Sequence, residues 1–562
     1  MKYANWNVPE RGAETPRALL AAGCTPLLAA ILHLRGLSNP AAARSFLRGG
    51  AETLTNPLEL TGMVDAVQRL TRAVATGEHV AVYGDYDVDG ITAACLLTDY
   101  LRFRGLTCEL YIPDRISEGY GLNAAAIDAL AEEGVTLIVT VDCGVTNLEE
   151  TAYAAQRGVD MIVTDHHECR EALPEAEAVV DPKQPDSSGV GTALAGVGVA
   201  FKLVCAMDGD ADKMLARYGD LVAVGTVADV MPLLGENRFI TRCGLQKIAA
   251  GDCRPGFLAL AEEAGVRDKP FTASTVGFSL APRINAAGRL GEPSLAVRLL
   301  EETDLRRARV LAAELCAKNR ERQALETEIW REAVERLHGE QPDAPIVLAS
   351  EGWHPGVIGI VASRLTDAYS VPAVMICLDG ESGKGSCRST GSFNLFEALS
   401  ACSDCLEGFG GHAMAAGVTV RRGCVDELRS RLREYYLSHP DRTLPALEAD
   451  LLVDSPELLT MACVESLDEL EPCGNGNPRP LLYMENVSLD SVQPIGGGKH
   501  LRLKLAKFGQ TYDGVFFSQT VPALGARAGQ RCDIVFAPQI NEFHGRRSVQ
   551  LVITDLRRSK EG

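Results

Sequence analysis

The feature that most constrains the fold is a regular alternation of short apolar segments and helix-like segments between residues 77 and 235. The expected strands lie within residues 79–90, 108–115, 135–144 and 159–167. Segments such as "NAAAIDALAEEG" and "EETAYAAQRG", which have the pattern of helices, separate them. Strands that alternate with helices at this spacing predict a parallel β-sheet covered by helices, and therefore an α/β fold.

Three of these expected strands run directly into acidic or imidazole side chains. The residues at the strand ends are Asp85, Asp87, Asp89, Asp142, Asp165, His166 and His167. A further carboxylate, Asp229, lies inside the apolar stretch "LVAVGTVADVMPL". Ligands of open α/β sheets bind beyond the carboxyl ends of the strands, so these groups are expected at one rim of the sheet.

Several carboxylates at one rim repel each other unless they are protonated or neutralised by cations. One or two divalent metals explain the set, and mostly oxygen donors with one or two nitrogens favour Mn²⁺ or Mg²⁺ over structural zinc. Each residue alone has an ordinary alternative. An Asp after a strand is usually a helix cap or turn residue, and Asp89 before Gly90 fits a turn as well as a ligand. The role of Asp229 alone is ambiguous, and its interpretation as a metal ligand depends on the other residues of the set.

Composition bounds the protein class. A chain of 562 residues is too long for one core, so three or four domains are expected. No apolar run is long enough to span a membrane, and no signal peptide is apparent. Seventeen scattered cysteines suit a reducing cytoplasm, and the single CxxC at 402–405 is interpreted as coincidence. The net charge of −20 argues against a simple nucleic-acid binder, although bound cations reverse the sign locally.

The rest of the chain divides by pattern. The absence of Gly and Pro from Asp304 to before His338 predicts a long helix, and strict alternation in "HLRLKLAKF" indicates a β-rich tail with a glycine turn at 494–500. The expected domains are a helical arm at 1–50, a catalytic α/β domain at 51–300, a connecting helix at 301–340, a smaller α/β domain at 341–440 and a β-barrel at 446–562.

Several motifs resemble a known family. "GDYDVDG", "VTVDCG", "VTDHH" and "GTVADVMPL" are similar, in order, to the four motifs of the DHH phosphoesterases. The segments that narrow the match to the RecJ family of single-strand-specific exonucleases are "IPDRISEGYGLN", "LAGVGVAFKL", "APRINAAGRL", "GWHPGVIGIVASRL", "GKGSCRS", "GFGGHAMAAG" and "EPCGNGNPRPL". The resemblance runs from about residue 50 to the end. It implies a DHH domain, a DHHA1 domain and an OB-like barrel.

The resemblance also implies a division of roles at the rim. Its metal ligands are Asp85, Asp87, Asp89, Asp142, His166 and Asp229. They would hold two cations bridged by Asp142, with Mn²⁺ preferred to Mg²⁺. His167 would support the leaving group or orient its neighbour, and Asp165 would hold a ring N–H. Many relatives carry His where this chain has Tyr83, a difference that can alter the coordination of one metal.

The substrate side is expected in the second α/β unit. "GKGSCRS" and "GFGGHA" offer two glycine-rich loops, the latter at an expected helix start, which is a natural anion site. The resemblance implies that Ser386 and Arg388 grip a 5′ phosphate and that Arg283 and His412 contact backbone phosphates. The remaining predicted substrate-binding residues are Asn285, Arg289, Gly410 and Gly411. Candidates for single-strand binding in the barrel are His500, Arg502, Lys504, Phe516, Phe517, Phe543, Arg546 and Arg547.

The expected activity is hydrolysis of single-stranded DNA from the 5′ end by a divalent-metal-dependent exonuclease of recombination and repair. It is expected to act as a cytoplasmic monomer, without membrane association, alongside a helicase and a single-strand-binding protein. Two alternatives stay open. A phosphodiesterase for short oligonucleotides or cyclic dinucleotides would usually lack the OB-like tail. A metal-free scaffold that only binds single strands would usually have lost its acidic ligands.

Overall fold

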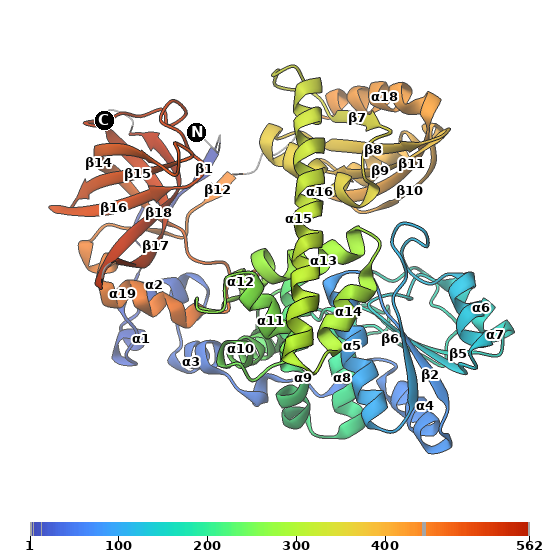
Figure 1. Cartoon of the computed structure of the whole chain (residues 1–562). Helices are drawn as coiled ribbons and strands as arrows, with labels where there is room; N and C mark the ends of the chain where they lie inside the picture. The colour runs from blue at the N-terminus through green and yellow to red at the C-terminus, as the bar shows by residue number, and fades with distance from the viewer. Residues whose placement is uncertain (1–2, 4, 13, 441–445, 544, 560–562) are drawn as a thin grey trace. The chain divides into compact units, whose positions relative to one another are not determined.

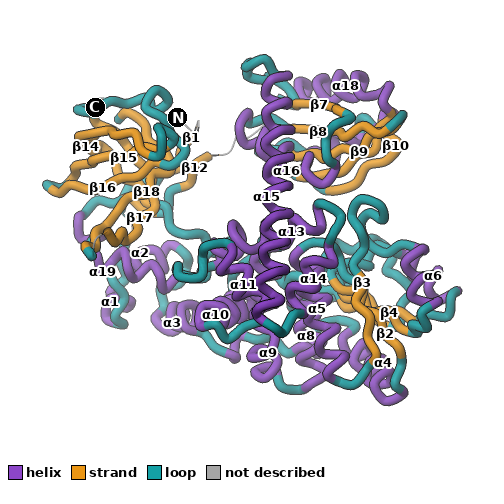
Figure 2. The backbone as a smooth tube through the Cα atoms, viewed as in Figure 1, coloured by secondary structure: helices purple, strands orange, loops and turns teal. Residues whose placement is uncertain are grey.

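The computed structural model describes residues 3, 5–12, 14–440, 446–543 and 545–559, drawn in Figures 1 and 2. Residues 1, 2 and 560–562, at the outer ends of two predicted domains, lie outside this description. The chain divides into two compact units. The larger unit comprises 51–442 and 474–476, and the smaller unit comprises 1–50, 443–473 and 477–562. No helix of the described part is both long and apolar enough to cross a membrane.

The larger unit contains the predicted parallel sheet, which is confirmed. Its strand order is β3-β2-β4-β5-β6, and every neighbouring pair is parallel. The strands are β2 (His79–Tyr83), β3 (Thr107–Tyr111), β4 (Leu137–Val141), β5 (Asp160–Thr164) and β6 (Ala178–Val180). The fifth strand, β6, was not predicted, because three residues carry too little pattern to identify a strand.

Both faces of this sheet are covered, as the apolar strands require. Val80 and Val82 pack in the core that contains α4, α5 and α8, whereas Ala81 and Tyr83 pack in a second core with α6 and α7. Successive side chains of a strand point to opposite faces, so β2 serves two cores at once. The covering helices are α4 (Met63–Thr76), α5 (Val88–Phe103), α6 (Ala124–Glu132), α7 (Leu148–Gln156) and α8 (Gly196–Asp208).

A helical layer continues the larger unit and leads to the connecting helix. Its elements are α9 (Ala211–Ala228), α10 (Gly235–Ala250), α11 (Pro255–Glu263), α12 (Ala273–Thr275), η3 (Val276–Leu280), α13 (Ala281–Arg289) and α14 (Pro293–Glu301). The predicted long helix is confirmed as α15 (Leu305–Arg336), about 48 Å long. Asp304 caps it by accepting hydrogen bonds from the backbone N–H groups of Arg306 and Arg307, each at 3.0 Å.

The second α/β domain has a mixed sheet of order β10-β11-β9-β8-β7, in which only β7 and β8 are parallel. The strands are β7 (Ile346–Ser350), β8 (Ala373–Asp379), β9 (Ser382–Arg388), β10 (Leu406–Gly411) and β11 (Ala415–Arg421). The helices are α16 (Pro355–Tyr369), α17 (Leu395–Ser400) and α18 (Val425–Ser438).

Two local expectations in this domain are wrong. "GKGSCRS" is strand β9 rather than a flexible loop, and "GFGG" ends strand β10 rather than starting a helix. Gly410 pairs with Gly417, Gly411 pairs with Ala416, and the backbone N–H of His412 donates to Ala415 across the hairpin at 2.8 Å. Pairing between strands decided the conformation, which the glycine pattern alone could not reveal.

The smaller unit contains the predicted OB-like barrel, also confirmed. Pairing of β14 with both β15 and β17 closes the ring β14-β15-β16-β18-β17. Its strands are β14 (Leu482–Ile495), β15 (His500–Lys507), β16 (Gln510–Phe516), β17 (Arg531–Phe543) and β18 (Arg546–Arg558). Leu501, Leu503 and Leu505 are buried in the barrel and Arg502 and Lys504 are exposed, as the alternation predicted.

The N-terminal helices belong to the core of the barrel unit. Leu27, Leu28 and Ile31 share one hydrophobic cluster with Leu467 and Leu470, which precede the barrel. The elements of this layer are β1 (Asn5–Asn7), α1 (Arg17–Ala21), α2 (Pro26–Leu34), α3 (Pro40–Arg48), β12 (Ala446–Glu448), β13 (Leu451–Leu452) and α19 (Met461–Ser466). This long-range packing was not evident from the sequence.

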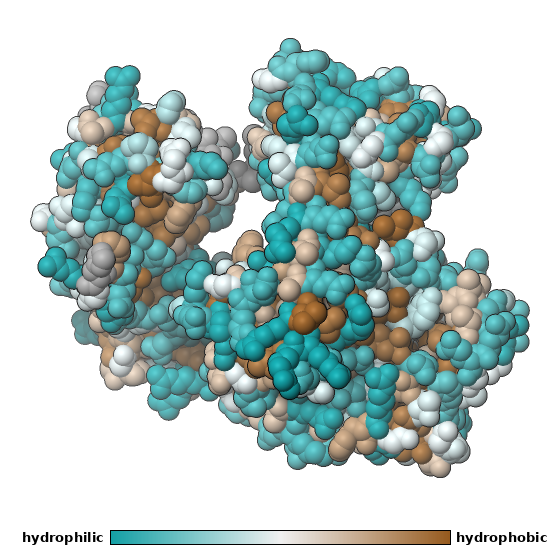
Figure 3. Space-filling model, in the orientation of Figure 1, coloured by the Kyte–Doolittle hydropathy of each residue, from teal (hydrophilic) through white to brown (hydrophobic). Residues whose placement is uncertain are grey.

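On the face shown in Figure 3, hydrophobic residues form only small groups among hydrophilic ones.

Candidate metal centre

Acidic and imidazole side chains from three strand ends and one helix end lie together at the carboxyl rim of the parallel sheet. Three sets of donor atoms each fall within 4.8 Å of one another: Asp85, Asp87 and Asp142; Asp89, His166 and Asp229; and Asp142, His166 and His167. The rim therefore brings together all six residues predicted as metal ligands.

Asp87 and Asp89 also have structural roles. Asp87 caps α5 through one oxygen, which accepts from the N–H groups of Asp89 at 2.9 Å and Gly90 at 3.1 Å. Asp89 accepts from the first turn of α8, from Gly196 N–H at 2.6 Å and Val197 N–H at 2.9 Å. The ordinary role of a helix cap therefore applies to Asp87, which also contributes a carboxylate oxygen to the donor set with Asp85 and Asp142.

Gly196, in "LAGVGVAFKL", lies where a side chain would collide with Asp142. A Cβ at Gly196 would lie 2.5 Å from the Cβ of Asp142, closer than two non-bonded carbon atoms can approach. Asp142 itself has a φ of 60°, in the left-handed region that residues other than Gly rarely adopt. Backbone strain at a non-glycine residue such as Asp142, which packs against the first turn of α8, is typical of a functional position.

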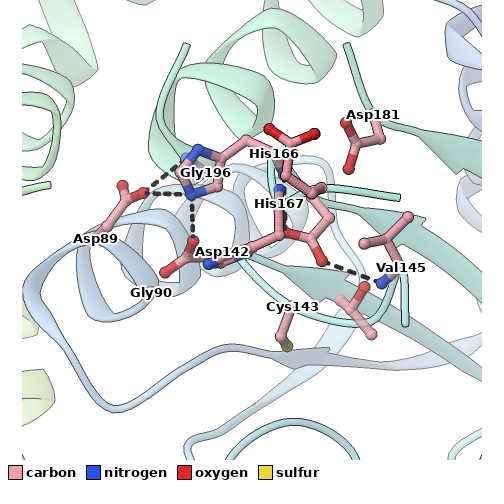
Figure 4. Close-up of polar contacts among 12 residues, drawn as sticks. Asp89, Gly90, Asp142, Cys143, Val145, His166, His167, Asp181 and Gly196 are labelled. Carbon is pink, nitrogen blue, oxygen red and sulfur yellow. Dashed lines mark hydrogen bonds and ion pairs between the residues drawn. The ribbon is translucent and has the colours of Figure 1, made fainter. Parts of the chain in front are cut away.

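His166 carries the most informative geometry. Its Nε2 lies 3.1 Å from Asp142 Oδ1 and 3.8 Å from Asp89 Oδ2 (Figure 4). The same atom lies 3.7 Å from Asp229 Oδ2. Both of its ring nitrogens are buried without a hydrogen-bond partner in the described structure, and the same holds for Asp85 Oδ1. Buried polar atoms are rarely left unpaired, because each costs about 1–3 kcal/mol. A bound cation would satisfy the donor atoms that face the cluster.

The electrostatics of the cluster agree with this interpretation. Burial, followed by the charges of neighbouring carboxylates, raises the pKa values of Asp85 and Asp142 well above the ordinary value. The same causes raise the pKa values of Asp89 and Asp229 to about 7. Such a cluster retains protons near neutral pH unless a cation compensates its charge, so the residues present fit a divalent metal.

Asp165 supports His167. Its Oδ1 accepts from His167 Nδ1 at 2.7 Å and from the N–H groups of His166 at 2.7 Å and His167 at 3.2 Å, and its Oδ2 accepts from Val145 N–H at 3.0 Å. Burial acts to raise the pKa of Asp165, but these hydrogen bonds outweigh it and hold the pKa below the ordinary value. Burial opposes the charge of His167, yet the bond to Asp165 raises the pKa of His167 to about 9. The ring N–H that Asp165 holds is therefore that of His167.

Tyr83 does not stand in for a histidine ligand. Its ring is buried in the core on the side of α6 and α7 and stacks on Tyr111 with a centroid distance of 5.0 Å. Its hydroxyl donates to the carbonyl of Gly121 at 3.0 Å.

A pocket of about 360 Å³ opens beside the cluster. Its lining residues are Asp85, Tyr86, Asp87, Arg115, Tyr120, Asp142, His167, Ala228, Asp229, Asn285 and Arg289. Asn285 and Arg289 were predicted on the substrate side, whereas Tyr86, Arg115 and Tyr120 were missed. The Arg115 guanidinium lies 4.9 Å from the centroid of the Tyr86 ring. The available signal was an arginine in a loop that follows β3 toward the same rim.

The other predicted substrate residues do not line this pocket: Arg283, Ser386, Arg388, Gly410, Gly411 and His412. Arg283 donates to the Ser279 carbonyl at 2.5 Å. Arg388 donates to Ser386 Oγ at 3.1 Å, so these two side chains contact each other on β9.

Arginine charge nevertheless links the pocket to the second α/β domain. Burial, followed by the charges of Arg115, Arg322 and Arg388, lowers the pKa of Arg289 to about 10. The Arg289 guanidinium donates to the carbonyl of Gly356 at the start of α16, at 3.1 Å. Guanidinium groups close enough to lower the pKa of Arg289 in this way form an environment that favours an anion such as a phosphate chain.

Comparison with known proteins agrees with this architecture. Residues 79–226 match the model of the DHH family, N-terminal domain, residues 333–437 match the DHHA1 domain, and residues 450–555 match the RecJ OB domain. The fold and the rim of carboxylates therefore define a phosphoesterase of the DHH class.

Full-length relatives narrow the class further. The chain is 36% identical to the single-stranded-DNA-specific exonuclease RecJ of Dickeya dadantii, over 98% of each chain. It is 40% identical to the corresponding protein of Bacillus subtilis, over 94% of this chain and 68% of that protein. The crystal structure of RecJ in complex with Mn²⁺ from Thermus thermophilus matches with a TM-score of 0.84 and 31% identity, over 99% of this chain and 80% of that one. The chain belongs to the RecJ family.

Proposed function

We propose that this protein is a divalent-metal-dependent exonuclease that hydrolyses single-stranded DNA from the 5′ end, in DNA recombination and repair. The observation that carries the proposal is His166, whose unpartnered ring nitrogens lie within a set of carboxylates at the sheet rim. Relatives named single-stranded-DNA-specific exonuclease RecJ, similar over nearly the whole chain, supply the substrate class.

The donor sets support two cation positions, with Mn²⁺ preferred to Mg²⁺. Asp85, Asp87 and Asp142 would hold one cation, and Asp89, His166 and Asp229 would hold the other, with Asp142 between them. When bound, such cations activate water and neutralise the charge that develops on phosphodiester oxygens.

The protein's own groups orient the substrate. Asp165 holds Nδ1 of His167, so the remaining Nε2–H of His167 is available to the leaving oxygen at the pocket wall. Arg115 and Arg289 would hold phosphate oxygens in the pocket, and Ser386 with Arg388 would hold a terminal 5′ phosphate. A site that holds the terminal 5′ phosphate would account for hydrolysis that starts at the 5′ end.

The setting of the reaction is part of the proposal. All seventeen cysteines lie in the described structure as free thiols, in keeping with a reducing cytoplasm. We expect a monomer that receives its substrate from a helicase and a single-strand-binding protein.

Digestion of end-labelled single strands, with and without a 5′ phosphate, tests the proposal in Mn²⁺, in Mg²⁺ and in chelator. The expected result is metal-dependent release of mononucleotides from the 5′ end, faster with the phosphate. Release from the 3′ end, or turnover of dinucleotides alone, would refute it.

A further inference from the structure

Phe278 is a large apolar side chain that lies outside the hydrophobic core. It is 84% exposed, in a helical segment whose buried residues, Val276, Leu280 and Ile284, form a continuous stripe. Phe278 lies two positions from both Val276 and Leu280, on the opposite face, where a solvated helix normally carries polar residues.

The sequence dictates an unusual backbone at this point. Pro282 has no N–H, so it cannot donate to the carbonyl of Phe278 four residues earlier, as an α-helix requires. The segment Val276–Leu280 is accordingly a π-helix, and Ala281 N–H donates to Val276, five residues back. Short π-helical turns inside α-helices are frequently found at functional sites.

The same turn packs beside the metal centre. A Cβ at Gly277 would lie 3.9 Å from Val227 Cγ1, in the last turn of α9, two residues before Asp229. Val230, which follows Asp229, is 66% exposed and has a φ of 58°. One exposed apolar side chain, Phe278, therefore lies on η3, and another, Val230, lies just beyond the end of α9.

Helical spacing connects Phe278 with the pocket. Phe278 precedes Asn285 and Arg289 by seven and eleven residues along the consecutive helical segments η3 and α13. Asn285 and Arg289 line the pocket. Seven residues span about 10 Å along a helix, or roughly three stacked nucleotides at ~3.4 Å each.

We propose that Phe278 is a stacking platform for a nucleobase of the single-stranded substrate, roughly three nucleotides from the pocket residue Asn285 along η3 and α13. A base offers an aromatic face whatever its identity, so the contact would hold the strand without reading its sequence. The inference rests on the proposed function, because it takes single-stranded DNA as the ligand.

Binding in chelator tests the platform independently of cleavage. We expect Phe278→Ala to weaken binding of a 5′-phosphorylated oligo-dT of about 20 nucleotides by about 5- to 150-fold, the range for loss of one stacked base. Phe278→Trp should retain affinity, and the new indole should be quenched by the strand. Phe103→Ala is the matched control, because Phe103 is also an exposed phenylalanine but ends α5, about 24 Å along the helix from the rim.

Turnover in Mn²⁺ separates the possible outcomes. The dinucleotide pTpT cannot reach Phe278, so its turnover should be unchanged in Phe278→Ala. Wild-type affinity of Phe278→Ala for the long strand would overturn the platform. An equal loss on both substrates would also overturn it, because it would indicate a role in folding or in contacts with protein. If the wild-type enzyme cleaves neither substrate, the proposed function fails instead.

Discussion

At the scale of single residues, the metal centre combines buried carboxylates that repel each other in the absence of a cation. We expect Asp142→Asn to reduce Mn²⁺-dependent cleavage by on the order of 10³-fold or more, because Asp142 belongs to one candidate cation set and its Oδ1 lies 3.1 Å from His166 Nε2 of the other. The same variant should melt at an equal or higher temperature in chelator, because one buried charge is removed. Thermal unfolding and single-turnover kinetics give the two readouts.

Asp379→Asn provides the control for Asp142→Asn, because Asp379 is exposed at the end of β8. It should change neither the activity nor the melting temperature. A variant of Asp142 that cleaves DNA at near-normal rates would contradict the assignment.

Asp165 acts through His167 and should therefore behave differently. In Asp165→Asn the hydrogen bond to His167 Nδ1 is weakened, while the donor sets keep all their members. We expect kcat to fall by about 10- to 100-fold, the usual range for a residue that orients an active-site group, with Mn²⁺ affinity nearly unchanged. Isothermal titration with Mn²⁺ beside steady-state kinetics checks the separation, and a parallel loss of metal affinity would contradict it.

Elements differ in how far the sequence alone could predict them. Four of the five strands of the parallel sheet were predictable because each is a short, largely apolar run, and three of them lead into acidic or imidazole side chains. The β10–β11 hairpin was misread as a helix start, because Gly410 and Gly411 permit both conformations and only pairing with β11 decides. Arg115 joined the pocket unpredicted, since its contact with Tyr86 depends on tertiary structure.

Helix α16 provides a prediction in which stability and activity separate. A Cβ on Gly359 would lie 2.8 Å from Ser386 Oγ and 3.3 Å from an Arg388 guanidinium nitrogen. Gly359→Ala raises helix propensity by about 1 kcal/mol but displaces this pair. If Ser386 and Arg388 hold the terminal phosphate, the preference for 5′-phosphorylated strands should fall while the melting temperature is maintained. Gly423→Ala, where a Cβ meets open space, should leave the preference intact.

The link between α4 and the sheet predicts a pH dependence of stability. Arg69 is buried and donates to Glu78 at 2.7 Å and Asp160 at 2.8 Å. Its hydrogen bond is the largest cause that lowers the pKa of Glu78, so this stabilisation is present above the ordinary pKa and is lost as the pH falls through the lowered one. Arg69→Met should therefore destabilise the protein at pH 7 and progressively less below about pH 4. Urea unfolding across this range checks the sign, and an equal loss at all pH values would contradict it.

At the scale of the whole molecule, two compact units with separate hydrophobic cores imply two unfolding transitions. The complete candidate donor set lies in the larger unit, because every member falls between residues 51 and 442. A cation that binds only the folded larger unit stabilises it by about 2.7 kcal/mol at a concentration of 100 Kd.

In calorimetry, Mn²⁺ should therefore raise the midpoint temperature of one transition relative to chelator and leave that of the other unchanged. The transition that does not move should be that of the barrel unit, and Asp142→Asn should abolish the metal-dependent shift of the first. A shift of both transitions by the same amount would show that the two units unfold together, and no shift at all would contradict metal binding at the rim. Because this experiment needs no DNA, it separates failure of the metal site from failure of the substrate assignment.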